Sequence, residues 1–241
     1  MTATLPRIVP AGLDGLIVRF GDILSEPANR AALAYRAAFD AEGVDGVAET
    51  ATSLVSTFVR FAPGADPDAV QARAATLMDS RDWTEAALPS GRRLVRVPTL
   101  YGTDRAPQLA AAAEAAGLSE ADAVTSLSSA RLRVTAIGFA PGQPYLGTLG
   151  EEWDIPRLTD LAQVPAAALV VAVRQLVLFA QASPTGWRHV GQTRLQLFRP
   201  EADTPFVLRP GDEVTFASIS ENAFDDLPDG PDGGAEWEDI A

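Results

Sequence analysis

Apolar and polar positions alternate in two different ways along the chain, which divides it into two parts. The first part has short apolar, β-branched runs that predict strands at 15–20, 43–50, 53–61 and 92–98. Two helices are expected among them. Residues 27–42 carry one apolar stripe that stops at Gly43, and the second helix starts with Asp66 as N-cap and Pro67 in its first turn. The order β-α-β-β-α-β indicates a small ferredoxin-like α/β domain.

The second part begins with two short helices and then changes to strands and turns. Gly117 ends the first helix, and Ser119 has capping-box spacing to Asp122 at the start of the second. Strands are expected at 131–137, on both sides of Arg174, at 194–198 and at 213–216. Because proline or glycine separates these short strands, the pattern favours a closed β-barrel.

These patterns predict an α+β protein with three segments. They are a ferredoxin-like domain at 1–90, a β-barrel domain at 91–220 and an acidic C-terminal tail at 221–241. The tail is rich in Asp, Gly and Pro, which is typical of partial disorder, although Phe224 and Trp237 could dock it. Because the tail holds many of the acids and no base, the rest of the chain is close to neutral.

The composition of the chain argues against several kinds of functional site and binding partner. The formal charge of −13 over 241 residues disfavours binding to nucleic acid or to an anionic membrane surface. The chain has no cysteine and no lysine, so thiol nucleophiles, thiolate metal sites, Schiff bases and a Walker lysine are excluded. The single histidine, His189, cannot build a histidine-rich site, and no metal is expected. Since the sequence shows neither a membrane-length apolar run nor a signal core, we expect a cytoplasmic protein.

The segment GFAPGQPYLG, residues 138–147, combines three glycines and two prolines with aromatic side chains. Glycine permits positive φ and opens the backbone N–H to a close partner, and successive N–H groups can bind an anion. The segment matches neither GxGxxG nor a Walker loop. From its residues alone, two interpretations stay open: a turn that only has to pack, or a loop whose main chain approaches a ligand.

This segment resembles the G-F-x-P-G-x-P-Y-L-G signature of the 5-oxoprolinase B-subunit family. That family is also called allophanate hydrolase subunit 1, and some members inhibit sporulation kinases. Further similar motifs lie before and after this segment in the chain, in the family's order. They are VPTLYG, GLSEADAV, IPR, VPAAALVVA, SPTGWRHVGQTRLQLFRP and LRPGDEVTF. The resemblance covers nearly the whole chain.

The resemblance implies a ferredoxin-like domain followed by a cyclophilin-like β-barrel. It also implies a C-type partner, similar to allophanate hydrolase subunit 2, and a pair similar to the carboxyltransferase domain of urea carboxylase. With a third, A-type subunit, family members form an ATP-dependent amidohydrolase that opens 5-oxoproline, a lactam, to glutamate. ATP is therefore implied for the complex, although this chain carries no nucleotide motif.

Nine residues are candidates for a substrate-binding wall, and no catalytic residue is assigned. They are Gly138, Phe139, Pro141, Gly142, Tyr145, Arg157, Trp187, His189 and Thr193. The loop residues could instead serve turn formation and packing. The Arg157 guanidinium suits a carboxylate or phosphate, or a surface ion pair. His189 titrates near neutrality, but the family requires no histidine there, so a merely polar position is the plainer interpretation. Trp187 is expected to anchor the barrel or an interface, and the role of Thr193 is open.

Several positions depart from the family pattern and indicate a divergent member. The family's Y-G-G has Thr103 in third place, V-P-A-G-S becomes VPAAA, and P-G-G-W becomes PTGW. A lost glycine can forbid a backbone geometry. Three functions stay open: the B-type subunit of a 5-oxoprolinase or allophanate-hydrolase-like complex acting on a small amide or lactam, a regulator that inhibits a histidine kinase, and a carboxyltransferase component.

Overall fold

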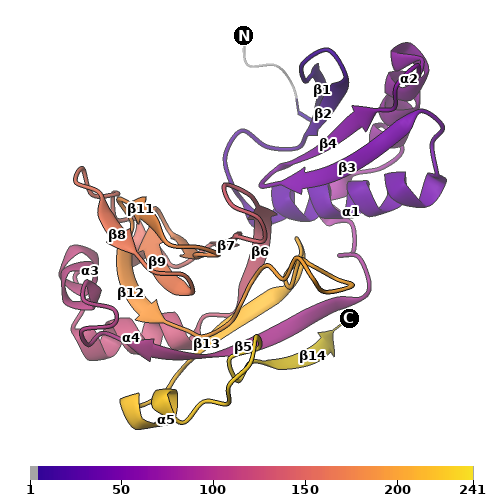
Figure 1. Cartoon of the computed structure of the whole chain (residues 1–241). Helices are drawn as coiled ribbons and strands as arrows, with labels where there is room; N and C mark the ends of the chain where they lie inside the picture. The colour runs from indigo at the N-terminus through magenta and orange to yellow at the C-terminus, as the bar shows by residue number, and fades with distance from the viewer. Residues whose placement is uncertain (1–4, 241) are drawn as a thin grey trace. The chain divides into compact units, whose positions relative to one another are not determined.

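The computed structural model describes residues 5–240, and they form two compact units that meet in the sequence between Ser90 and Gly91. Figure 1 shows the N-terminal unit in indigo and purple and the C-terminal unit in the later colours. Each unit has its own buried core.

The N-terminal unit is a four-stranded antiparallel sheet with two helices. Its strands, in spatial order, are β1 (Arg7–Pro10), β2 (Gly15–Arg19), β4 (Ser56–Phe61) and β3 (Val47–Ser53). The helices are α1 (Glu26–Glu42) and α2 (Pro67–Met78), followed by the short 3-10 helix η1 (Trp83–Glu85). Figure 1 shows α1 running across the sheet. Its buried Tyr35 and Phe39 pack with Leu16 and Val59 of the strands.

Both helices begin where the sequence predicts. The Ser25 hydroxyl accepts from the Ala28 N–H at the start of α1, and Gly43 ends this helix with φ +58°. Asp66 caps α2, with its carboxylate accepting from the Asp68 N–H at 3.0 Å. Capping satisfies N–H groups that have no partner inside the helix. The Gly43 stop and the Asp66–Pro67 start were thus predicted from the sequence, whereas the Ser25 cap was not.

The strand predicted at 92–98 forms, but it does not complete a ferredoxin-like sheet. It is β5 (Arg92–Tyr101), which lies in the C-terminal unit and pairs with three strands there. The fourth strand of the N-terminal sheet is β1, which was not predicted. Counting β5 as the last strand of the β-α-β-β-α-β order was wrong, although the expected boundary at residue 91 already placed it in the second domain. Alternation of apolar residues shows that a strand exists, but not which strands it pairs with.

The C-terminal unit is a closed seven-stranded barrel, as expected. Its strands are β5, β6 (Leu132–Ile137), β7 (Pro144–Gly147), β9 (Ala168–Ala172), β10 (Gln175–Leu178), β12 (Arg188–Gln192) and β13 (Glu213–Ser218). The spatial order is β6-β13-β5-β12-β9-β10-β7, and the pairing of β7 with β6 closes the barrel. Within residues 5–240, β5 and β13 are the one parallel pair of this barrel. Alternate residues of these strands, such as Val97, Leu146, Val171, Leu176 and Phe216, fill one large core.

Four smaller elements complete this part of the unit. They are α3 (Leu109–Ala116), α4 (Glu120–Ser129), the 3-10 helix η2 (Glu151–Trp153) and a ribbon of β8 (Ala162–Val164) with β11 (Ser183–Thr185). Val164 packs with Val170, Val177 and Phe179 in a second cluster, separate from the main core. The β8 strand therefore covers the face of β9 and β10 that points away from the barrel interior.

Residues 221–240 are ordered, contrary to the expected partial disorder. They form α5 (Glu221–Asp225) and β14 (Glu236–Ile240), drawn in yellow beside β5 in Figure 1. The pairing of β12 with β5 is limited to the end of β5, at Leu100 and Tyr101. The first half of that β5 edge is therefore open, and β14 pairs with it from Arg92 to Arg96. An unpaired edge is a template for a further strand, which the composition of the segment does not reveal.

The strand expected at 194–198 is absent. In the described chain this stretch makes only an isolated bridge, between Phe198 and Phe206. Leu195 and Leu197 are nevertheless buried in the main core. The alternation that predicted a strand here reflects burial of every second side chain, without a neighbouring strand to pair with.

Candidate functional site

The loop 138–143 joins β6 and β7, the two strands that close the barrel. It is held from within, because Gly138 N–H donates to the Gln143 carbonyl at 3.0 Å and Gln143 N–H donates to the Ala140 carbonyl at 3.1 Å. Gly142 has φ +75°, and a Cβ there would lie 2.6 Å from the Leu197 carbonyl oxygen. This position therefore requires glycine for both conformation and space.

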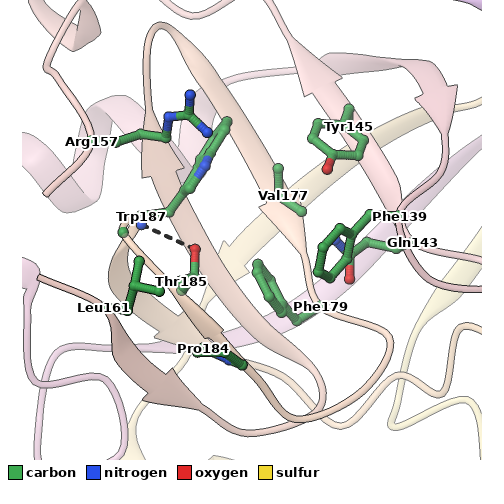
Figure 2. A pocket seen from close by; sticks show the side chains of 11 residues that line it. Phe139, Gln143, Tyr145, Arg157, Leu161, Val177, Phe179, Pro184, Thr185 and Trp187 are labelled. Carbon is green, nitrogen blue, oxygen red and sulfur yellow. Dashed lines mark hydrogen bonds between the residues drawn. The ribbon is translucent and has the colours of Figure 1, made fainter. Parts of the chain in front are cut away.

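A pocket of about 210 Å³ opens beside this loop. It is lined by Phe139, Gln143, Tyr145, Arg157, Leu161, Val177, Phe179, Pro184, Thr185, Gly186 and Trp187. Figure 2 shows Phe139 and Gln143 on the side opposite Arg157 and Leu161, with Val177 and Phe179 between them. The lining thus comes from the loop, from β7, from β10 and the residue after it, from the segment 154–161 between η2 and β8, and from the segment that contains β11.

The pocket lies on the outer face of the barrel wall. Tyr145, Val177, Val170 and His189 are successive cross-strand neighbours on β7, β10, β9 and β12. Residues directly opposite each other in a ladder point to the same face of the sheet. Val170 and Val177 belong to the second cluster and not to the barrel core, so this row faces outward.

The polar groups of the lining are hydrogen-bond donors that remain available. The Gln143 Oε1 accepts from the Ala180 N–H at 3.4 Å, which leaves the amide nitrogen for a ligand. The Thr185 Oγ1 accepts from the Trp187 N–H at 3.1 Å, so its own O–H can donate. The Arg157 guanidinium has no hydrogen bond or ion pair with any residue between 5 and 240. Since no Asp or Glu of the described chain lines the pocket, it suits a small, acceptor-rich anion.

Comparison with known proteins identifies the family. The family model of the carboxyltransferase domain, subdomains C and D, matches residues 6–208. The chain belongs to this family.

Curated relatives of this carboxyltransferase-domain chain are components of one enzyme. The chain is 40% identical over 143 residues to the B subunit of 5-oxoprolinase from Escherichia coli O157:H7, covering 58% of this chain and 66% of that protein. It is 34% identical over 134 residues to the B subunit of 5-oxoprolinase from Bacillus subtilis (strain 168), covering 55% and 56%. The matches therefore span less than two thirds of the relatives' length. They confirm the resemblance to the 5-oxoprolinase B-subunit family.

Solved structures agree on the architecture of this carboxyltransferase-domain chain. The protein TTHA0988 is 30% identical with a TM-score of 0.70, covering 86% of this chain and 40% of that one. Urea carboxylase of Kluyveromyces lactis is 15% identical with a TM-score of 0.72, covering 97% and 24%. The second likeness supports the fold alone, because the identity is too low to carry a site.

Four of the nine candidate residues of the carboxyltransferase-domain chain meet at the pocket: Phe139, Tyr145, Arg157 and Trp187. The Tyr145 and Trp187 rings lie edge to face with centroids 6.4 Å apart. The other three loop candidates, Gly138, Pro141 and Gly142, do not line it. They shape the turn that presents Phe139.

The last two candidates, His189 and Thr193, also lie outside the lining. Thr193 donates through its hydroxyl to the Ala167 carbonyl at 3.1 Å, a packing role. The side chain of His189 is buried, and its Nε2 has no hydrogen-bond partner among residues 5–240. Burial lowers the pKa of His189, an effect that the polar groups of Gly191 and Gln192 only partly offset. The imidazole is therefore neutral at pH 7.

Sequence reasoning missed most of the pocket's other lining residues. Gln143 was within the quoted motif, and its place between two prescribed turn positions was a signal that could have been used. Leu161, Val177, Phe179, Pro184 and Thr185 come from separate strands and turns. Only the closing of the barrel and the covering ribbon bring them to one place.

Two of the family glycines missing here fall at left-handed backbone positions. Thr103 has φ +61° and Ala167 has φ +60°. The conformation that glycine would adopt freely is thus retained by residues with a Cβ, at a cost of roughly 1–2 kcal/mol each. The expected loss of geometry does not occur, since neighbouring contacts fix it: the Ala167 N–H donates to the Phe179 carbonyl at 2.7 Å.

Residues 5–240 lack two kinds of structural feature. They contain no group of three or more His, Asp or Glu side chains that could hold a metal ion. No helix in that range is long and apolar enough to cross a membrane.

Proposed function

We propose that the chain is the B-type subunit of an ATP-dependent 5-oxoprolinase-like amidohydrolase, and that its pocket forms one wall of a site completed by a C-type subunit. The relatives that are named as B subunits of 5-oxoprolinase support this proposal. The A-type subunit, the use of ATP and a cytoplasmic location remain predictions that come with it.

Arg157, unpaired among residues 5–240 and placed in a pocket lined by donors, is the observation that carries the proposal. 5-Oxoproline is a small acid with a carboxylate and a lactam carbonyl. The Arg157 guanidinium would hold the carboxylate through a planar fork of N–H groups. Aromatic faces from Tyr145 and Trp187 would cover the ring, and the Gln143 amide would donate to the carbonyl oxygen.

The rim of the pocket supports a shared site. Phe139 is 74% exposed and Leu161 is 68% exposed, although both are large apolar side chains. Such a rim is stabilised when a second surface removes it from water. The lining that the structure describes contains no carboxylate, histidine or lysine, so the pocket offers mainly binding groups. The C-type subunit would supply the reacting groups, and ATP would activate the lactam oxygen.

The test is turnover by the purified three-subunit complex, measured as ATP hydrolysis with and without 5-oxoproline. Arg157→Gln should raise KM for 5-oxoproline about 10- to 100-fold, the effect of losing a charge-assisted hydrogen bond. Arg60→Gln, which alters an exposed arginine of the N-terminal unit, is the control and should leave KM unchanged. ATP turnover that never depends on 5-oxoproline would contradict the proposal.

A carboxyltransferase role is the second candidate, because the matching family model carries that name. A biotin carrier would have to be a separate chain, since this one has no lysine to modify. Transfer of a carboxyl group from carboxybiotin to a small amide by the complex, without 5-oxoproline turnover, would favour it. The kinase-inhibitor interpretation stays a prediction with no observation of its own.

A further inference from the structure

A second groove lies on the C-terminal unit, formed by other residues than the pocket. Its volume is about 450 Å³, and its lining residues are Arg93, Arg199, Thr204, Phe206, Val207, Arg209, Asp232 and Trp237. They come from β5, from the segment 199–209 and from the acidic end of the chain, including β14. No lining residue is shared with the pocket.

Two aromatic side chains are held open to solvent in this groove. Phe206 is 55% exposed and Trp237 is 37% exposed. The Phe206 ring packs on Phe198 with centroids 5.3 Å apart, and the Trp237 ring lies 4.9 Å from the Arg93 guanidinium carbon. Rings that are fixed before binding lose little entropy when a partner covers them. Exposed, immobilised aromatic residues beside arginines are typical of the energetically important part of a protein interface.

The three arginines of the groove are also fixed in place. Arg93 pairs with Asp212, whose side chain is fully buried, and donates to the Val207 carbonyl at 3.0 Å. Arg199 pairs with Asp232 at 2.6 Å, and the Arg209 guanidinium lies 3.7 Å from Asp212. Three positive charges thus face two carboxylates, one of which is out of solvent. These groups leave the groove one positive charge in excess, on a chain whose formal charge is −13.

We propose that this groove docks an acidic segment of the C-type subunit, one that places an apolar side chain between Phe206 and Trp237. The inference rests on the proposed function for the partner's identity. Charge complementarity selects acidic chemistry: each arginine keeps N–H donors beyond those that its internal contacts use. It also disfavours a second copy of this chain, because two chains of −13 repel each other.

The test uses calorimetry to measure association of the 241-residue chain with the purified C-type subunit. Thr204 is exposed, lines the groove and is suited to a matched pair of charge variants. Thr204→Glu should weaken binding about tenfold or more, and Thr204→Arg should preserve or tighten it. Phe206→Ala should also weaken binding about tenfold. Leu13→Ala, a change at an exposed apolar side chain of the N-terminal unit, is the control and should bind as wild type.

Salt gives an independent measurement. Wild-type affinity should fall as salt rises from about 0.05 to 0.5 M, and the fall should be smaller for Thr204→Glu. If the wild-type chain does not bind the C-type subunit, the proposed function itself fails. If it binds but Thr204→Glu and Phe206→Ala bind equally well, this groove is not the docking surface and the proposed function stands. Turnover at saturating partner should be the same for all four variants, since none of them alters the pocket.

Discussion

At the scale of single residues, positive φ values mark the positions near the pocket where the backbone must adopt the left-handed conformation. Gly142 meets this demand with glycine, and Phe139 and Ala167 meet it with a Cβ in place. The family pattern identified Gly142 and the missing glycine at 167 as important positions. Sequence alone did not show that Ala167 would keep the left-handed conformation, in which its N–H donates to the carbonyl of Phe179, the residue after β10.

Gly142→Val should destabilise the C-terminal unit by more than about 3 kcal/mol. The change adds left-handed strain to an overlap with the Leu197 carbonyl, which is backbone and cannot move aside easily. The measurement is the free energy of unfolding in urea. Gly138→Val is the matched control: its Cβ would meet nothing within 4 Å and its φ is not left-handed. Equal stability of the two variants would contradict this account of the loop.

Ala167→Gly should do the opposite and stabilise the unit by about 0.5–1 kcal/mol. Relief of left-handed strain exceeds the extra chain entropy that glycine brings to the unfolded state. Its neighbour Ala168 is fully buried in β9 with ordinary strand geometry. Ala168→Gly should therefore destabilise by roughly 0.5–1 kcal/mol. Thermal or urea unfolding of both variants against wild type checks the sign, and a destabilised Ala167→Gly would contradict the strain.

At the scale of elements, the cross-strand row from Tyr145 to His189 joins the pocket wall to a buried imidazole. His189 lies two strands from Val177 and lines no part of the pocket. It lies farther along the same outward face, where it is buried and does not reach the pocket, so a histidine in this motif need not be a catalytic base. Sequence reasoning favoured a merely polar position over a base, but it could not show that the ring is buried, because burial follows from the register of β12 on β9.

The stability of the unit should depend on pH through His189. Its pKa is lowered in the folded chain, so below the ordinary value of about 6.5 the unfolded chain takes up the proton first. The free energy of unfolding should therefore fall as pH drops from 7 to 5, by at most about 1.4 kcal/mol per pH unit. His189→Gln should remove this part of the slope. Urea unfolding at several pH values measures it, and identical slopes in both chains would contradict the buried neutral imidazole.

β5 shows what element prediction from sequence can and cannot achieve. Its apolar alternation predicted a strand, and the structure has one of ten residues. Its three partners lie far away in the chain, and one is the acidic β14. Strand pairing overrides the low β-propensity of Glu236, Glu238 and Asp239. The side chains of these three residues remain exposed, and the Glu238 carboxylate pairs with Arg96 at 3.0 Å.

At the scale of the whole molecule, two cores with separate residues support two units of different architecture. The barrel and the mixed class followed from the sequence because turn residues and short strands repeat along the second half. The ferredoxin-like label remains a prediction that the strand order β1-β2-β4-β3 does not establish. Four of the nine candidate residues reach the pocket, and all four stand on motifs of the family. The rest of the lining could not be foreseen, since it depends on how the covering ribbon folds over the barrel.

The placement of the pocket on the outside of the barrel wall has a consequence for how such proteins diverge. Along β9 and β10, one set of side chains fills the barrel and the alternate set faces the ligand space. Mutations in the outward set, in the covering ribbon or at the rim can therefore change which molecule is recognised while the barrel stays intact. One scaffold of this kind can give rise to lineages that differ in chemistry yet superpose closely.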